Sequence, residues 1–252
     1  MKALLVAVAL AGCVEPYPPD GDPHGVFELR EVRRWDLARP VVAMDSDGAD
    51  GAWVIFENTS TLVHLASDAS TTSEIPIVDL EVPLADDRPW TSVVGLAHAG
   101  DVVWVSHRRD ANMLRAYDVQ TGELRKSFAS ETGLSDVDAF GDELRYAVIW
   151  DVIVGLDSDR GGERWRQDYD GECCGIARGI ASMTDDLVWV STLEERLFLV
   201  DKKLGVIGSG LSGVRDDDFM WTVDSIGHHL GWNGTYVLMS QGNEIHWLEP
   251  VF

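Results

Sequence analysis

Two aspartates and one arginine stand where charged side chains are costly, inside short runs rich in β-branched residues. Asp138 and Asp224 fall at one position when residues 136–140 and 222–226 are aligned, and Arg178 in the run 177–181 falls one residue away. Paired carboxylates can divide acid and base roles when their environments separate their pKa values. The same residues also suit a structural Arg–Asp pair in a hydrated channel, or a site for a polar ligand or a cation.

Other chemistry-bearing residues lie in the segments that lead into these runs. Trp90 and Trp221 stand beside acidic residues, and an exposed indole there would offer a flat apolar platform to a sugar or a peptide. Tryptophan packed in a core is the alternative. Cys173 and Cys174 are adjacent. Outside the cytoplasm such a pair forms either a vicinal disulfide or two reduced, packed thiols.

An aspartate-rich segment offers the only pattern with a metal-binding character. Asp45, Asp47 and Asp50 belong to the segment DSDGADG, which places oxygen ligands at alternate positions as calcium loops do. The bidentate glutamate that completes the EF-hand spacing is missing, so a solvated Asp-Gly turn is the favoured interpretation. No cofactor is predicted apart from the calcium ion that this loop leaves open.

The N-terminus carries a targeting signal. Lys2 gives a positive start, and residues 3–10 form an apolar run too short to cross the roughly 30 Å hydrocarbon layer. The following Leu10-Ala11-Gly12-Cys13 resembles the lipobox of bacterial lipoproteins. This resemblance implies that Cys13 is acylated, becomes the first residue of the mature chain and anchors it in the cell envelope, including the outer membrane. The alternatives are an ordinary secretory peptide and a buried strand that happens to end in Cys.

The segment after Cys13 separates the signal from the body of the chain. Four prolines between residues 14 and 23 forbid a helix and discourage sheet pairing, which predicts an extended stalk. The expected organisation is a signal peptide over residues 1–12, a lipidated cysteine and stalk over 13–25, and one domain over 26–252.

The composition excludes one class of partner. The chain has 20 basic and 43 acidic residues, a formal net charge of −23, which repels phosphate backbones. Nucleic-acid binding is therefore not expected. Hydrophobic residues make up 45% of the chain, so the acidic groups are expected on the surface of a folded domain.

A weak repeat of about 45 residues predicts the architecture. Its most legible part is an acidic or glycine turn followed by a strand centred on an aromatic residue, and short strands alternate with Gly, Asp and Asn turns throughout. We expect an all-β fold, a single β-propeller of about five four-stranded blades. A β-sandwich and a six-bladed ring are the alternatives. The anchoring aromatic residues are Trp53, Trp104, Tyr146, Trp189 and Tyr236.

Two copies of the repeat carry further information. Residues 116–124 and 155–165 resemble the blade repeat of quinoprotein-like, or YVTN-like, propellers, with an Asp that ends one strand, a Gly in the turn and a Trp in the outer strand of the second copy. The resemblance implies the propeller fold. It says little about chemistry, because such propellers include enzymes, scaffolds and sensors.

The first strand of the domain is expected to close the ring. The chain ends with a strand around Trp247, which leaves the last blade one strand short, whereas residues 27–35 alternate as a strand and belong to no complete unit. We therefore predict that this segment is the outermost strand of the last blade. Simple alternation places one set of its residues on a common face: Phe27, Leu29, Glu31, Arg33 and Trp35.

These observations favour a non-catalytic function. The lipid tether, the stalk and the absence of catalytic motifs predict an envelope lipoprotein that acts as a binding or scaffold module for a protein or carbohydrate ligand, with a role in outer-membrane assembly as a special case. The alternative is an envelope enzyme, a hydrolase, lyase or quinoprotein-like protein, with Asp138 and Asp224 in the central channel.

Overall fold

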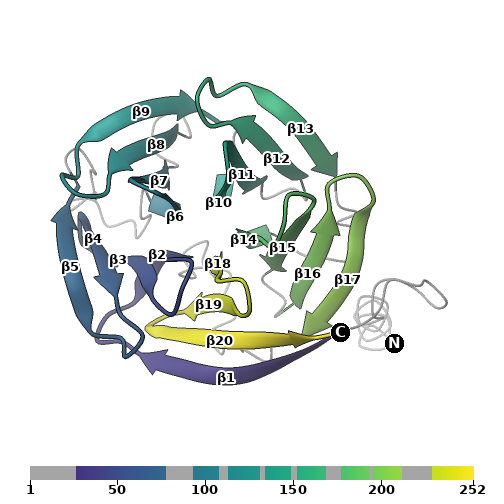
Figure 1. The fold of residues 1–252 in the computed structure, drawn as a ribbon, viewed down its shortest axis with the longest axis horizontal. Helices are drawn as coiled ribbons and strands as arrows, with labels where there is room; N and C mark the ends of the chain where they lie inside the picture. The colour runs from purple at the N-terminus through teal and green to yellow at the C-terminus, as the bar shows by residue number, and fades with distance from the viewer. Residues whose placement is uncertain are drawn as a thin grey trace, which may run out of the picture.

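The chain folds into five blades around one axis. The computed structural model describes residues 27–77, 93–107, 113–130, 134–148, 152–168, 177–192, 196–211 and 229–252. Within these ranges, twenty strands form five four-stranded sheets, and neighbouring strands of each sheet are antiparallel (Figure 1). The predicted all-β, five-bladed propeller is confirmed.

Each blade runs from an inner strand near the axis to an outer strand at the rim. Blade 1 contains β2 (Val41–Ser46), β3 (Ala52–Phe56), β4 (Thr61–Leu65) and β5 (Thr71–Pro76). Blade 2 contains β6 (Val93–Ala99), β7 (Val102–His107), β8 (Met113–Asp118) and β9 (Leu124–Ala129). Blade 3 contains β10 (Leu134–Phe140), β11 (Glu143–Val148), β12 (Val152–Asp157) and β13 (Glu163–Asp168).

The last two blades differ in how they are completed. Blade 4 contains β14 (Ala177–Ser182), β15 (Leu187–Thr192), β16 (Arg196–Asp201) and β17 (Gly205–Leu211). Blade 5 contains β18 (Leu230–Trp232), β19 (Val237–Gln241), β20 (Glu244–Val251) and, as its outer strand, β1 (Glu28–Asp36) from the start of the domain. The inner strand β18 lies further along the chain than the inner strand predicted at residues 222–226. Those predicted residues are outside the described part of the chain.

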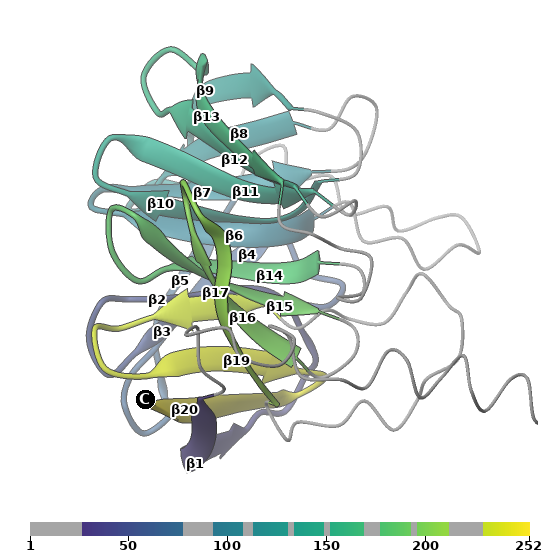
Figure 2. The ribbon, with the colours of Figure 1, turned by 90° about the vertical axis from the view of Figure 1, so that its right-hand side faces the viewer.

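The hairpin turns that join inner strands to their neighbours gather on one side of the disc, at the left of Figure 2. In blade 2 the turn between β8 and β9 is ordered by Asp118, whose Oδ1 accepts two backbone N–H groups at 2.8 Å. Arg125 pairs with Asp118 and with Asp101 in the inner turn, and Gly122 adopts a φ of 71°. These backbone bonds and Arg125 lower the pKa of Asp118 to about 2. Blade 3 repeats the arrangement with Asp142, Asp157, Gly161 and Arg164.

The predicted closure by the first strand is confirmed, with one correction. β1 pairs with β20 from Glu28 opposite Val251 to Asp36 opposite Glu244. A β-bulge between Glu31 and Arg33 shifts the alternation by one residue. The expectation that Phe27 and Trp35 share a face is therefore wrong. Phe27 packs against Trp189 of blade 4, and Trp35 packs against Trp247 in the cluster that faces blade 1.

The hydrophobic core lies between neighbouring blades. The inner strands of blades 1 to 4 each have a bulge, and the residue opposite the third position after it points toward the next blade. Trp53, Trp104 and Trp189 occupy this position in blades 1, 2 and 4. In blade 3 the residue there is Arg145, not the predicted anchor Tyr146, which points back toward blade 2. The sequence alignment preferred the aromatic residue, and it was one residue out of register.

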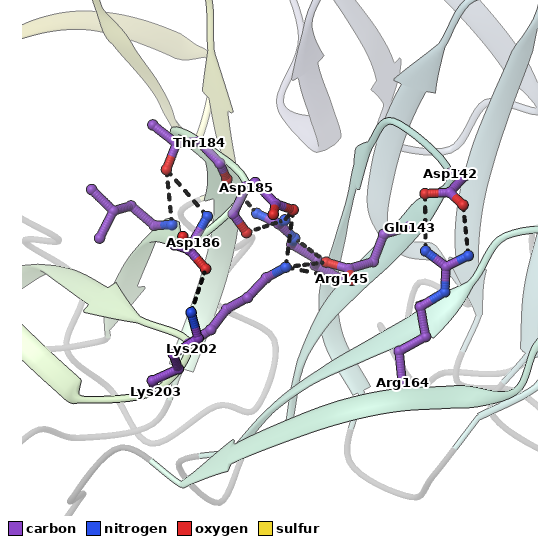
Figure 3. A network of polar contacts seen from close by, with 10 residues as sticks. Asp142, Glu143, Arg145, Arg164, Thr184, Asp185, Asp186, Lys202 and Lys203 are labelled. Carbon is purple, nitrogen blue, oxygen red and sulfur yellow. Dashed lines mark hydrogen bonds and ion pairs between the residues drawn. The ribbon is translucent and has the colours of Figure 1, made fainter.

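Arg145 builds a polar interface where blades 1, 2 and 4 use tryptophan (Figure 3). Its side chain is 0% exposed. Its Nε donates to Glu143 at 2.6 Å, and its two terminal nitrogens donate to the carbonyls of Thr184 and Asp185 in blade 4, both at 2.7 Å. Lys202 of blade 4 reaches back to Glu143 at 3.1 Å. Blades 3 and 4 are therefore joined by hydrogen bonds to a buried cation.

Candidate functional site at the propeller axis

Buried aspartates on the inner strands link neighbouring blades. Asp45 on β2 and Asp138 on β10 occupy equivalent positions, each the third residue after the bulge. Asp45 accepts the backbone N–H of His98 on β6 at 2.7 Å, and Asp138 accepts that of Ser182 on β14 at 2.6 Å. Each carboxylate thus takes a hydrogen bond from the inner strand of the next blade.

Asp136 connects more blades than either of these residues. It follows the bulge of β10 directly, and its carboxylate accepts the N–H of Ile180 on β14 at 3.1 Å and that of Leu230 on β18. His229 Nδ1 lies 3.6 Å from Asp136 Oδ1. On the other side, a Cβ added to Gly95 on β6 would come within 2.2 Å of the same carboxylate. Asp136 therefore contacts the inner strands of blades 2, 4 and 5 from blade 3.

Burial changes the protonation of these acids. Burial raises the pKa of Asp136 and of Asp45 well above the usual value, and the neighbouring carboxylate of Asp138 raises both further. Burial also raises the pKa of Asp138, although hydrogen bonds from Ser182 and the charge of Arg145 oppose that change. The axis thus holds carboxyl groups that retain a proton at a higher pH than exposed aspartates do.

Replacement of Asp136 by Asn is expected to change how stability depends on pH. Because the folded-state pKa of Asp136 is raised, its contribution is fully present below the unfolded-state value near 3.8 and is lost as pH rises through the folded-state pKa. An amide does not titrate. The free energy of unfolding of Asp136→Asn minus that of the wild type should therefore increase with pH from about 4 upward, by about 1.4 kcal/mol per unit of pKa shift. Urea unfolding at several pH values measures this difference.

The half-buried turn aspartate Asp118 provides the matched control, because its pKa is lowered to about 2. Its contribution is present above the unfolded-state value and is lost as pH falls toward 2, so Asp118→Asn should show its pH-dependent difference on the acid side. An Asp136→Asn difference that is flat between pH 4 and 8 would contradict the assignment of Asp136 as a buried acid with a raised pKa.

The structure changes the expected grouping of the candidate residues. Arg178 is half-buried at the bulge of β14, near the start of that strand, whereas Asp138 bonds to Ser182 near its end. The cation that lowers the pKa of Asp138 is Arg145. Asp224 lies outside the described residues. The sequence alignment missed Asp45 and Asp136, although the Asp136-Val-Asp138 spacing places two acids on one face of a strand.

The three aspartates of the proposed calcium loop do not converge. Asp45 points to the axis, and Asp50 is exposed in the turn. Asp47 Oδ1 accepts the N–H groups of Ala49 and Gly51 at 2.8 and 3.0 Å, so it orders the turn between β2 and β3. In the part of the chain that the structure describes, no group of three His, Cys, Asp or Glu side chains is arranged to hold a metal ion.

Asp47 also ends a chain of polar contacts that sequence analysis missed. Its Oδ2 lies 3.0 Å from His64 Nε2, and His64 Nδ1 lies 2.6 Å from the hydroxyl of Thr72. His64 also packs on Trp53, with ring centroids 4.5 Å apart. The Thr72 hydroxyl bonds to the His64 carbonyl at 3.2 Å. These contacts join three strands of blade 1 to its inner turn, which assigns the cluster a structural role.

Several predicted site residues lie outside the described residues: Cys13, Trp90, Cys173, Cys174 and Trp221. The outer strands β5, β13 and β17 end, and the inner strands β6, β14 and β18 begin, on the side opposite the inner hairpin turns. Among the described residues, no helix is both long and apolar enough to cross a bilayer.

The fold and axis define a five-bladed β-propeller, and comparison with known proteins agrees. No protein-family model matches the sequence, and no curated protein matches it. The structure is similar to that of glutaminyl cyclase from Myxococcus xanthus, with a TM-score of 0.65 and 10% identity over 89% of this chain and 97% of that chain. It also matches BamB from Moraxella catarrhalis, with a TM-score of 0.43 and 15% identity over 84% of this chain and 61% of that one.

Proposed function

We propose that this chain is an envelope lipoprotein, anchored through a lipid on Cys13, whose propeller serves as a non-catalytic binding or scaffold module. The motif Leu10-Ala11-Gly12-Cys13 supports the anchor, and the proline-rich residues 13–25 would act as its stalk after removal of residues 1–12. The described chain enters the propeller at β1, the outermost strand of blade 5. A tether attached there holds the domain by its rim.

The proposed non-catalytic role rests on the hydrogen bonds that the axial carboxylates make between blades. Asp45, Asp136 and Asp138 each accept backbone N–H groups from the inner strand of another blade. A buried polar group that is hydrogen-bonded in this way contributes to the architecture, and breaking it leaves backbone donors without partners. Holding the ring together is therefore a sufficient explanation for these buried acids.

The binding surface that we propose is the side where the chain crosses from one blade to the next. Trp90 and Trp221 belong to crossings into β6 and β18, and Cys173 and Cys174 to the crossing into β14. Indole rings beside acidic residues are suited to a peptide or a glycan in the envelope. A vicinal disulfide between the two cysteines would stiffen the crossing that contains them.

An envelope pull-down with crosslinking tests this function. The full-length protein should incorporate a palmitate analogue and fractionate with membranes, and Cys13→Ser should lose both properties.

A double variant, Trp90→Ala with Trp221→Ala, should reduce capture of the crosslinked partner at least tenfold without changing the melting temperature. Leu204→Ala is the control, because Leu204 is 71% exposed in a turn on the opposite side. Equal capture by the double variant and the wild type would contradict the proposed surface.

One observation favours an enzyme as the second candidate. Burial raises the pKa of three axial acids, which would let them keep a proton to donate at a higher pH than exposed aspartates do. A propeller of similar fold is a glutaminyl cyclase, so peptides with an N-terminal glutamine are the first substrates to assay. If the purified chain turned over a substrate, and if Asp138→Asn or Asp224→Asn abolished that turnover, the enzyme alternative would replace the scaffold proposal.

A further inference from the structure

The turn between β18 and β19 connects the last blade to the first. It contains Asn233, whose Nδ2 donates to the backbone carbonyl of Ala49 in the inner turn of blade 1 at 2.9 Å. The two blades approach closely here, because a Cβ added to Gly231 on β18 would lie 2.4 Å from the backbone nitrogen of Ser46. We call this contact between residues 231–236 and residues 46–50 the closing seam. Asn233 therefore donates a side-chain hydrogen bond across the seam where the ring of blades closes.

The same side chain also orders its own turn. Asn233 Oδ1 accepts the N–H of Thr235 at 3.0 Å and that of Tyr236 at 2.7 Å. Both ends of the carboxamide are thus engaged, since its nitrogen donates and its oxygen accepts. Gly234 adopts a φ of 94°, a conformation that residues with a side chain rarely adopt. The turn therefore uses an amide at position 233 and a glycine directly after it for structural reasons.

An asparagine followed by glycine is a chemically labile pair. Asparagine belongs to the thermolabile residues. The backbone nitrogen of the following residue attacks Cγ, the Cγ–Nδ2 bond breaks, and ammonia leaves with the proton of the attacking N–H, so that a succinimide ring forms. Water then opens this ring to aspartate or isoaspartate. Glycine favours the attack because no Cβ obstructs its nitrogen, and Asn233-Gly234 is the only Asn-Gly pair in the chain.

The contacts of Asn233 oppose this reaction while the closing seam is intact. The attack turns the planar carboxamide into a tetrahedral centre and expels Nδ2. Oδ1 and Nδ2 must then leave the positions in which the turn N–H groups and the Ala49 carbonyl hold them. The attacking group is not held in this way, because no described residue accepts the N–H of Gly234, which is exposed. Release of the side-chain amide therefore controls the reaction.

We propose that Asn233 is a modification site that deamidates when the closing seam opens. Local opening frees the amide without unfolding the whole domain. The aspartate that forms presents only oxygen atoms to the carbonyl of Ala49, and it adds a negative charge beside the turn that holds Asp47 and Asp50. Isoaspartate also lengthens the backbone of the turn by one carbon atom. Either product weakens the seam permanently, and this inference does not depend on the proposed binding function.

Peptide mass spectrometry of the full chain, incubated in mildly alkaline buffer with and without guanidinium chloride, measures the reaction. Asn233 should deamidate at least tenfold more slowly in the folded chain than in the denaturant, the equivalent of about 1.4 kcal/mol. Asn243 is the internal control, because its Nδ2 also donates to a carbonyl, that of Leu37 at 3.0 Å, but Glu244 follows it. It should react more slowly than Asn233 in the denaturant. Equal rates for Asn233 in the folded and denatured chain would refute protection by the seam.

Gly231→Ala tests the seam itself, because its Cβ would press on the backbone of blade 1. This variant should raise the deamidation rate of Asn233 in the folded chain at least tenfold. Gly210→Ala is the matched control, because its Cβ would lie 2.7 Å from the ring of Phe27 at the junction of blades 4 and 5 instead. It should leave the rate unchanged. A folded Gly231→Ala variant that deamidates at the wild-type rate would overturn the proposal, and if this variant does not fold, the comparison with the denatured chain still decides.

Two further variants test the chemistry and its consequence. Gly234→Ala in guanidinium chloride should deamidate at least tenfold more slowly than the wild type, because the added Cβ obstructs the attacking nitrogen. An unchanged rate would exclude the succinimide route. Asn233→Asp reproduces the main chemical change and should lower the melting temperature. A melting temperature equal to that of the wild type would show that deamidation does not weaken the seam.

Discussion

Deletion of residues 26–36 is expected to unfold the propeller, whereas deletion of residues 14–23 should leave its stability almost unchanged. The first deletion removes β1 and exposes the edge of β20. It also removes Phe27 and Trp35, which are 3% and 5% exposed. Loss of one such aromatic side chain costs about 3–5 kcal/mol. The loss of two such side chains approaches the whole free energy of unfolding of a typical domain, about 5–15 kcal/mol.

Thermal unfolding and gel filtration of the two truncated proteins measure the contrast. A synthetic peptide covering residues 26–36 should restore cooperative unfolding to the first truncation, because it supplies the missing outer strand. The replacement of both Phe27 and Trp35 by Ala in the intact chain is the matched control. This double variant keeps strand β1 but should lose much of the stability that the deletion of residues 26–36 removes. Similar melting temperatures for both truncations would show that β1 is dispensable.

Arg145→Ala should destabilise the propeller by about 3–5 kcal/mol, the cost of breaking a buried ion pair from one side. The substitution leaves Glu143 buried beside Lys202 alone, and it leaves the carbonyls of Thr184 and Asp185 without their Arg145 donors. Chemical denaturation measures the loss. Arg125→Ala is the control, because Arg125 makes two ion pairs from an exposed position and should have a small effect.

A triple variant separates the charge network from packing. Replacement of Glu143 by Leu, Arg145 by Met and Lys202 by Met removes the whole network and should recover most of the stability lost in Arg145→Ala, because hydrophobic replacement of a buried network is often neutral or favourable. If the single variant lost less than about 1 kcal/mol, the hydrogen bonds to blade 4 would not hold this interface.

The sequence allowed the fold to be predicted further than the site. Turn chemistry and the repeated strands predicted five blades, because Asp118 and Asp157 order equivalent turns in the same way. Closure by β1 was also predictable, since the last blade lacked a strand. The bulge near Val32 was not, because a bulge leaves no clear mark in an alternating strand. It moved Phe27 and Trp35 to different faces.

The site was harder to predict, because it depends on how the inner strands align with one another. Their bulges lie at equivalent positions in blades 1 to 4, but sequence alone does not reveal them. Without them, the equivalence of Asp138 and Asp45 was overlooked. The preference for an aromatic residue likewise favoured Tyr146 over Arg145. A buried arginine in a position that tryptophan holds in blades 1, 2 and 4 cannot be recognised from residue type alone, since its burial depends on carbonyl groups from another blade.

The pairing of β1 with β20 has a consequence for the order of folding. Its contacts join Glu28 to Val251, nearly the whole length of the domain, while blades 1 to 4 each form from consecutive strands. Long-range pairing is slow because the intervening chain must be ordered first. β1 is therefore synthesised first and paired last. Its charges, including Arg30, Glu31 and Arg34, would discourage the waiting strand from pairing with other chains in that interval.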